Sequence, residues 1–222
     1  MNALLGALAH LLWPVSCPMC GRLGVHVCRG CLESVASDLP LFCLECGTDG
    51  PCGVHRGALV SAGSVYSGAA RELVHIMKYE NARSIAKMAG EMLAARFGRP
   101  AADFIVPIPL HKSSERDYNQ AELLAQGAGG VWRLDTANVL KWKTVIPRQA
   151  LKPGSERAPL PEDAMCVSCA LDGARVFLVD DVYTSGSTMR AAARALGGSG
   201  ATVTGAMVWC RAVSKGHGRP AF

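Results

Sequence analysis

The feature that most constrains this chain is a short apolar run that ends in two adjacent acids. Residues 176–179 are four consecutive apolar residues, two of them valine, as in a buried strand. Asp180 and Asp181 follow directly, and an Ala-rich stretch over residues 189–196 predicts a helix. This order indicates an open α/β sheet, in which ligands bind at the carboxyl ends of the strands.

The loop between the acids and the predicted helix has the composition of a phosphate site. Its four Ser and Thr hydroxyls can donate to phosphate oxygens, and its single glycine lets the backbone approach a ligand closely. The start of the next helix adds free N–H groups and the positive end of a dipole. The two acids suit the 2′- and 3′-hydroxyls of a ribose, or a hydrated Mg²⁺. The candidate residues are Asp180, Asp181, Thr184, Ser185, Gly186, Ser187 and Thr188.

A simpler interpretation is a buried strand with a capping Asp, followed by a core helix. That interpretation explains one acid and one hydroxyl, but not two acids and four hydroxyls within nine residues. The thirteen residues 176–188 instead resemble, at every position, the 5-phosphoribosyl-1-pyrophosphate (PRPP) signature of type I phosphoribosyltransferases.

A second candidate ligand segment follows a predicted strand at residues 103–108. Lys112 and Arg116 offer cationic donors for a pyrophosphate group. Asn119 precedes a predicted helix at residues 119–126 and is a suitable cap for it. The alternative is a polar loop with a cap and solvated charges.

Seven of the ten cysteines fall between residues 17 and 52. Six of them form three pairs separated by two residues, and the seventh, Cys52, has the same spacing to His55. Each such turn aims two ligand atoms at one metal, and two turns complete a tetrahedral site. Because we find no secretion signal, we expect a reducing compartment and zinc rather than disulfides. The simplest assignment is sequential, although the spacing leaves an interleaved pairing open. The sequential assignment gives two structural sites. The first has Cys17, Cys20, Cys28 and Cys31 as ligands, and the second has Cys43, Cys46, Cys52 and His55.

The remaining cysteines do not make a third site of this kind. Cys166 and Cys169 supply only two ligands, and we expect them to be packed thiols near a strand. Cys210 follows an apolar stretch and is expected to be buried.

Alternating strands and helices predict a parallel sheet with helices on both faces. We expect residues 1–56 to form a lead-in and a double zinc ribbon, and residues 57–222 to form the α/β domain. No apolar run reaches the ~18–20 residues of a membrane helix. The predicted strands are 58–66, 103–108, 175–179 and 202–208, the predicted helices are 68–79, 82–97, 119–126 and 188–196, and 129–170 is predicted to be irregular.

With these segments in view, the chain resembles the ComF family, competence proteins with a phosphoribosyltransferase-like domain behind a double zinc ribbon. The shared features are the four metal-ligand pairs, Met77-Lys78-Tyr79, residues 106–110 and 118–124, Gln149 with Arg157, and the PRPP signature. The resemblance departs in two segments. Before the helix at 119–126 the loop is shorter, one arginine is missing and Asp117 replaces a glycine, and after Arg157 an asparagine is replaced by Leu160.

The resemblance implies two structural Zn²⁺ ions, and Mg²⁺ bound with PRPP. It places Lys112 and Arg116 at the pyrophosphate and Arg157 on a mobile loop. It also implies a cytoplasmic protein that assists uptake of single-stranded DNA with a helicase-like partner or other competence proteins.

Two other functions fit the same residues: an active phosphoribosyltransferase of unknown acceptor, and a non-catalytic sensor of PRPP. No residue stands out as a base-recognition group, so the sequence assigns no catalytic residue. The net charge of +5 permits a polyanion partner. Candidate DNA-binding residues are the cations Arg22, Arg29, Arg56, Lys78, Arg83 and Lys87, and the stacking platforms Trp13 and Tyr79.

Overall fold

The structure, a computed structural model, describes residues 15–55, 57–79, 82–111, 114–143, 160–161 and 163–213. The chain forms two compact units, Met1–Ala36 and Ser37–Phe222. The smaller unit holds the first cysteine group and helix α2 (Arg29–Val35). The second cysteine group belongs to the larger unit, with the sheet. Residue 56 therefore marks the end of the cysteine-rich sequence, whereas the compact units divide after residue 36.

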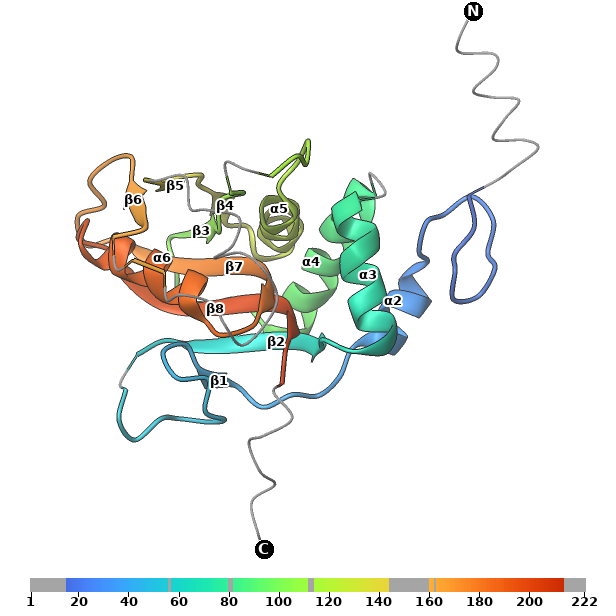
Figure 1. The fold of residues 1–222 in the computed structure, drawn as a ribbon, viewed down its shortest axis with the longest axis horizontal. Coiled ribbons are helices and arrows are strands. Elements are labelled where there is room, and N and C mark those ends of the chain that lie inside the picture. Colours follow the sequence, from blue (N-terminus) through green and yellow to red (C-terminus); the bar gives the residue numbers. More distant parts are fainter. Residues whose placement is uncertain are drawn as a thin grey trace, which may run out of the picture. The chain divides into compact units, whose positions relative to one another are not determined.

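The larger unit is built on a six-stranded sheet (Figure 1). Its strands, in spatial order, are β1 (Phe42–Cys43), β2 (Leu59–Val65), β8 (Thr202–Arg211), β7 (Arg175–Tyr183), β3 (Phe104–Pro107) and β4 (Asp135–Thr136). Only β1 is antiparallel to its neighbour, so the predicted parallel sheet is confirmed apart from this edge strand. Tyr183 pairs with Arg211, which brings the carboxyl ends of β7 and β8 to the same edge.

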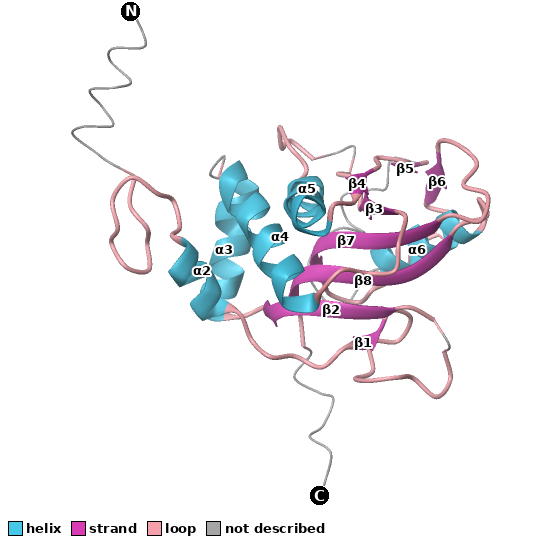
Figure 2. Cartoon of the chain, turned by 180° about the vertical axis from the view of Figure 1, so that it is seen from behind, coloured by secondary structure: helices cyan, strands magenta, loops and turns pink. Residues whose placement is uncertain are grey.

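Helices cover both faces of the sheet, as predicted (Figures 1 and 2). Helices α4 (Arg83–Phe97) and α5 (Gln120–Trp132) lie on one face, with α3 (Gly68–Tyr79) beside α4. Helix α6 (Ser187–Gly197) lies on the other face. Leu178 and Val208, on the two central strands, are completely buried, so the core is centred on β7 and β8.

Helix α5 continues to Trp132, beyond the predicted end at residue 126. Its glycines have low helix propensity, but one of them, Gly127, allows close packing against α4. A Cβ atom at Gly127 would lie 2.0 Å from the carbonyl oxygen of Lys87, and one at Gly90 would lie 2.0 Å from that of Leu124. Packing therefore overrides local propensity at the end of this helix.

The prediction of irregular structure over residues 129–170 was wrong in three further places. Strand β4 joins the main sheet, and β5 (Leu140–Trp142) pairs with β6 (Met165–Val167) in a separate antiparallel two-stranded sheet. Such two- and three-residue strands are too short to leave a periodic pattern. Residues 144–159 lie outside the described residues.

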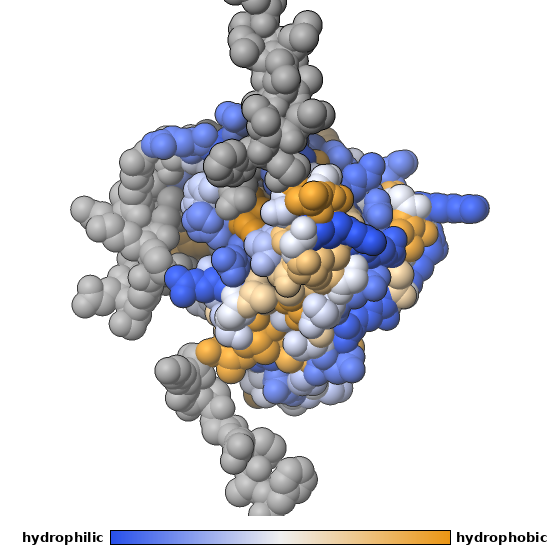
Figure 3. Space-filling model, turned by 90° about the vertical axis from the view of Figure 1, so that its right-hand side faces the viewer, coloured by the Kyte–Doolittle hydropathy of each residue, from blue (hydrophilic) through white to orange (hydrophobic). Residues whose placement is uncertain are grey.

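Within the described part of the chain, every helix falls short of the length and apolar character needed to cross a bilayer. On the face drawn in Figure 3, hydrophilic residues (blue) surround smaller apolar areas (orange). Apolar atoms are a normal part of protein surfaces, so these areas need no special explanation.

Candidate functional site

Strand β7 carries the acid pair near its carboxyl end. The sequence had predicted that Asp180 and Asp181 follow the strand. The strand extends to Tyr183, however, so both acids lie within it. The main-chain N–H of Asp181 donates to Oδ1 of Asp180 at 2.7 Å. Burial, followed by the neighbouring charge of Asp181, raises the pKa of Asp180 to about 8. The Asp180 carboxyl therefore holds its proton more tightly than an ordinary aspartate does.

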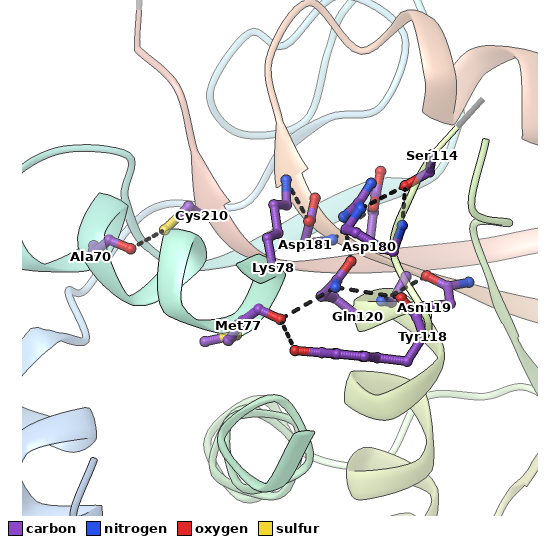
Figure 4. Close-up of polar contacts among 12 residues, drawn as sticks. Ala70, Met77, Lys78, Ser114, Tyr118, Asn119, Gln120, Asp180, Asp181 and Cys210 are labelled. Atoms are coloured by element: carbon purple, nitrogen blue, oxygen red, sulfur yellow. Dashed lines mark hydrogen bonds and ion pairs between the residues drawn. The ribbon is translucent and has the colours of Figure 1, made fainter. Parts of the chain in front are cut away.

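Lys78 is a member of this site that the sequence analysis had assigned to a DNA-binding surface. It lies in the last turn of α3, and its Nζ is 2.6 Å from Oδ2 of Asp181 (Figure 4). Its side chain is only 23% exposed, so the prediction of an exposed cation was wrong. Burial alone would lower the pKa of Lys78, but the Asp181 carboxylate outweighs this effect and raises it.

The segment after β3 meets the same end of α3. The carbonyl oxygen of Met77 accepts hydrogen bonds from the Tyr118 hydroxyl and, at 3.2 Å, from Nε2 of Gln120 (Figure 4). Gln120 is almost fully buried. These contacts hold the residue before Lys78 against the start of α5, so three segments distant in sequence converge here.

Arg116 and Asn119 both lie at the start of α5. The Arg116 guanidinium donates to Gln120 Oε1 and, at 2.9 Å, to the Ser114 hydroxyl. Oδ1 of Asn119 accepts from the N–H of Ala121 at 3.1 Å, which confirms the predicted cap of α5. Lys112 and Arg157 lie outside the described residues.

These side chains surround a pocket of about 140 Å³. Its lining combines cations with the acid pair and includes Lys78, His111, Arg116, Gln120, Asp180, Asp181 and Thr188. A larger hollow of about 430 Å³, beside α5 and β4, shares none of these residues. We place the candidate site at the smaller pocket because a phosphorylated sugar needs cations for its phosphate groups and carboxylates that accept from its hydroxyl groups.

The hydroxyl-rich loop joins this pocket to the start of α6. Gly186 is the N-cap of α6 and adopts a left-handed backbone conformation, with φ of 74°. Ser185 Oγ and Ser187 Oγ lie 2.6 Å apart. The loop thus lies at the N-terminus of an eleven-residue helix, where free N–H groups favour an anion.

The two cysteine groups form in the sequential order. The ligand atoms of Cys17, Cys20, Cys28 and Cys31 lie within 4.8 Å of one another, as do those of Cys43, Cys46, Cys52 and His55. Sulfur–sulfur distances of 3.6 Å (Cys20–Cys28) and 3.7 Å (Cys46–Cys52) rule out disulfides at these pairs. They match the ~3.8 Å edges of a tetrahedron with Zn–S bonds of about 2.3 Å.

The second cluster also offers a favourable donor set for a metal. Oγ1 of Thr48 lies 3.2 Å from the sulfur of Cys46, and this contact lowers the pKa of Cys46 to about 6. Nδ1 of His55 lies 3.4 Å from the sulfur of Cys52. Thiolate is the form of cysteine that binds metal, so the residues present fit a tetrahedral divalent ion.

The other three cysteines are distributed differently. Cys210 is completely buried, as predicted, and burial raises its pKa to about 12. Cys166 lies in β6 and is partly buried, whereas Cys169 is exposed, so the expectation of a packed thiol was wrong for Cys169.

Comparison with known proteins gives a consistent result. Residues 152–220 match the family model described as phosphoribosyl transferase domain. "DNA utilization protein YhgH" from Salmonella typhi is 29% identical and covers 83% of this chain and 88% of its own length. The Escherichia coli O6:H1 protein of the same name is 27% identical and covers 90% of this chain and 95% of its own length.

Two of the solved structures that are similar to this chain are adenine phosphoribosyltransferases. The enzyme from Thermoanaerobacter pseudethanolicus has a TM-score of 0.38 at 20% identity, covering 58% of this chain and 68% of that chain. The enzyme from Leishmania tarentolae has a TM-score of 0.39 at 14% identity, covering 72% and 94%. The family-model match and the parallel sheet identify the larger unit as a type I phosphoribosyltransferase fold. The relatives named DNA utilization protein YhgH align over most of its length, and they support the resemblance of this chain to the ComF family.

Proposed function

We propose that this protein binds PRPP with Mg²⁺ at the carboxyl end of β7 and assists the uptake of single-stranded DNA in natural transformation. The observation that carries the ligand proposal is the meeting of Asp180, Asp181, Lys78 and Arg116 around one pocket beside the hydroxyl-rich loop. The relatives named DNA utilization proteins support the second part.

In this proposal, Asp180 and Asp181 accept hydrogen bonds from the ribose hydroxyls, and the loop from Thr184 to Thr188 binds the 5′-phosphate. Arg116 neutralises the pyrophosphate, and Lys112 and Arg157, which lie outside the described residues, are further candidates for the same role. Asp180 and Asp181 would also suit a hydrated Mg²⁺, which would offset the negative charge of the bound PRPP. Lys78 balances the negative charge of the acid pair before the ligand binds, because it forms an ion pair with Asp181.

A thermal-shift experiment tests the ligand site. A ligand that binds only the folded state stabilises it by ~2.7 kcal/mol at a hundredfold excess over its dissociation constant. Millimolar PRPP with Mg²⁺ should therefore raise the melting temperature, and Asp181→Ala should abolish the increase. Asp163→Ala is the control, because Asp163 is a 78% exposed acid outside the pocket. An unchanged melting temperature in the parent protein would refute the site.

The exposed cations Arg22, Arg83 and Lys87 support contact with DNA phosphates. Binding through phosphates releases counterions, so affinity should fall steeply with salt. We expect binding to fluorescent single-stranded DNA without sequence preference, largely lost between ~50 and ~200 mM salt. Equally tight binding to duplex, or none at low salt, would contradict this part of the proposal.

Two assays separate the alternative functions. Release of pyrophosphate from PRPP in the presence of candidate bases would indicate an active transferase. A deletion strain scored for transformation separates a competence factor from a PRPP sensor. A cytoplasmic location and a helicase-like partner belong to the same proposal, because imported single strands must be received on the inner side of the membrane.

We also assign structural zinc to both cysteine clusters, on the basis of their donor atoms and spacing. Metal analysis of reduced, chelator-free protein should find about two zinc ions per chain, by ligand count.

A further inference from the structure

The second cysteine cluster is hydrogen-bonded to the phosphate loop through its backbone. The turn between Cys43 and Cys46 presents two carbonyl groups to the end of β7 and the start of α6. The Tyr183 hydroxyl donates to the carbonyl oxygen of Leu44 at 3.1 Å. Nη1 of Arg190 donates to the carbonyl oxygen of Glu45 at 2.8 Å and also to that of Ser185 at 2.9 Å. A single guanidinium nitrogen therefore joins the metal-binding turn to the loop.

Strand β8 contacts the same turn. The Arg211 guanidinium donates to the carbonyl oxygen of Gly47 and pairs with Asp49. It also lies 4.0 Å from the centroid of the Phe42 ring, and that ring meets the Tyr183 ring edge-on at 4.8 Å. The carboxyl ends of both central strands are thus anchored to residues 42–49.

The contacts leave little room for adjustment. A Cβ atom at Gly186 would lie 2.3 Å from the Tyr183 hydroxyl and 2.9 Å from Nη1 of Arg190. On the other side, a Cβ atom at Gly47 would lie 3.5 Å from the same hydroxyl. Tyr183 is only 4% exposed. These side chains are therefore confined between the turn and the loop.

We propose that the Cys43–Cys46 turn holds the phosphate loop in its binding conformation, so that metal at the second cluster sets the affinity for sugar phosphate. Tyr183 and Arg190 are positioning residues in this arrangement. The inference rests on the proposed ligand function and adds a control over the same site. Metal fixes the turn by joining its two cysteines to Cys52 and His55, and the carbonyls of the turn then fix Tyr183 and Arg190.

The first cluster provides a matched control, because it belongs to the other compact unit. Cys20 and Cys46 are both exposed and are both the second cysteine of a pair. The experiment compares Cys20→Ser with Cys46→Ser, measuring zinc content and calorimetric affinity for ribose 5-phosphate. We expect Cys46→Ser to weaken binding about tenfold, the equivalent of ~1.4 kcal/mol. Cys20→Ser should bind as the parent does. Equal affinities in all three proteins would overturn the inference.

Arg190→Met tests the connection without touching a metal ligand. It removes donors to both Glu45 and Ser185, and it should weaken ribose 5-phosphate binding while zinc content stays unchanged. Arg190→Lys, which retains one charged donor, should recover part of the affinity. The control is Arg175→Met at the opposite end of β7, where Arg175 pairs with Asp103. Parent-like affinity in Arg190→Met would contradict the positioning role.

Amide hydrogen exchange separates this inference from the proposed function. If the parent protein binds neither PRPP with Mg²⁺ nor ribose 5-phosphate, the proposed ligand is wrong, but the coupling can still be measured in the loop itself. Exchange of residues 184–190 should speed up in Cys46→Ser and in Arg190→Met, and should be unchanged in Cys20→Ser. Parent-like exchange in Cys46→Ser after zinc loss would overturn the coupling whatever the ligand result.

Discussion

At the scale of single residues, the acid pair itself can be recognised from the sequence, whereas its contact with Lys78 requires the structure. The order of Asp180 and Asp181 before a hydroxyl-rich loop is a local signal, and the sequence was sufficient to find it. Lys78 was missed because its contact with Asp181 spans about a hundred residues and has no local pattern. The available signal was its position at the end of an amphipathic helix, where an exposed and a buried cation look alike in sequence.

The environment of Asp180 predicts a pH dependence of stability. Its pKa is about 8 in the folded protein and about 4 in an unfolded chain. Between these values the fold keeps a proton that the unfolded chain has released, so this contribution is complete below about pH 4 and is lost as pH rises through about 8. The slope can reach ~1.4 kcal/mol per pH unit.

Asp180→Asn should remove this slope, because asparagine is neutral throughout. We expect the parent's free energy of unfolding to fall more steeply between pH 5 and 8 than that of Asp180→Asn, as measured by urea unfolding at several pH values. Asp163→Asn, at an exposed acid, should keep the parent's profile. Parallel profiles for the parent and Asp180→Asn would show that Asp180 titrates normally.

At the scale of elements, the sequence predicted what periodicity and composition encode. Strands β2, β3 and β8, and helices α3 and α4, were found close to their observed bounds. The antiparallel edge strand β1 was missed because its two residues fall inside the cysteine pattern. The end of α5 was missed because glycine lowers helix propensity locally, while its benefit, close packing on α4, depends on tertiary structure.

Two glycines in α5 provide a direct test of that explanation. Replacing glycine by alanine in a helix interior normally stabilises it by ~1 kcal/mol. Gly130→Ala should show this gain, because no atom lies within 4 Å of the added Cβ. Gly127→Ala should instead destabilise the protein by ~1–3 kcal/mol, because the Cβ would overlap the α4 backbone. Similar effects of both substitutions on urea unfolding would contradict the close-packing explanation.

At the scale of the whole molecule, the two cysteine clusters look alike in sequence but belong to different compact units. The sequence places both in one N-terminal module, since their spacing is the same. The structure instead gives the second cluster an edge strand, β1, that pairs with β2. We therefore expect a metal at the second cluster to stabilise the unit that contains the sheet, and a metal at the first cluster to stabilise the smaller unit.

This difference predicts unequal consequences when one site is lost. Structural metal binding contributes directly to folding free energy, and 1 kcal/mol shifts the melting temperature by ~2–4 °C in a unit of this size. Cys46→Ser should therefore lower the main calorimetric transition by roughly 4–8 °C, for a loss of about 2 kcal/mol. Cys20→Ser should leave that transition within ~2 °C of the parent, although each variant loses one zinc ion.

Cys169→Ser, at an exposed thiol outside both clusters, should retain both metals and the parent's transition. Equal decreases in the two cluster variants would mean that both metals stabilise a single cooperative unit, in conflict with the division after residue 36.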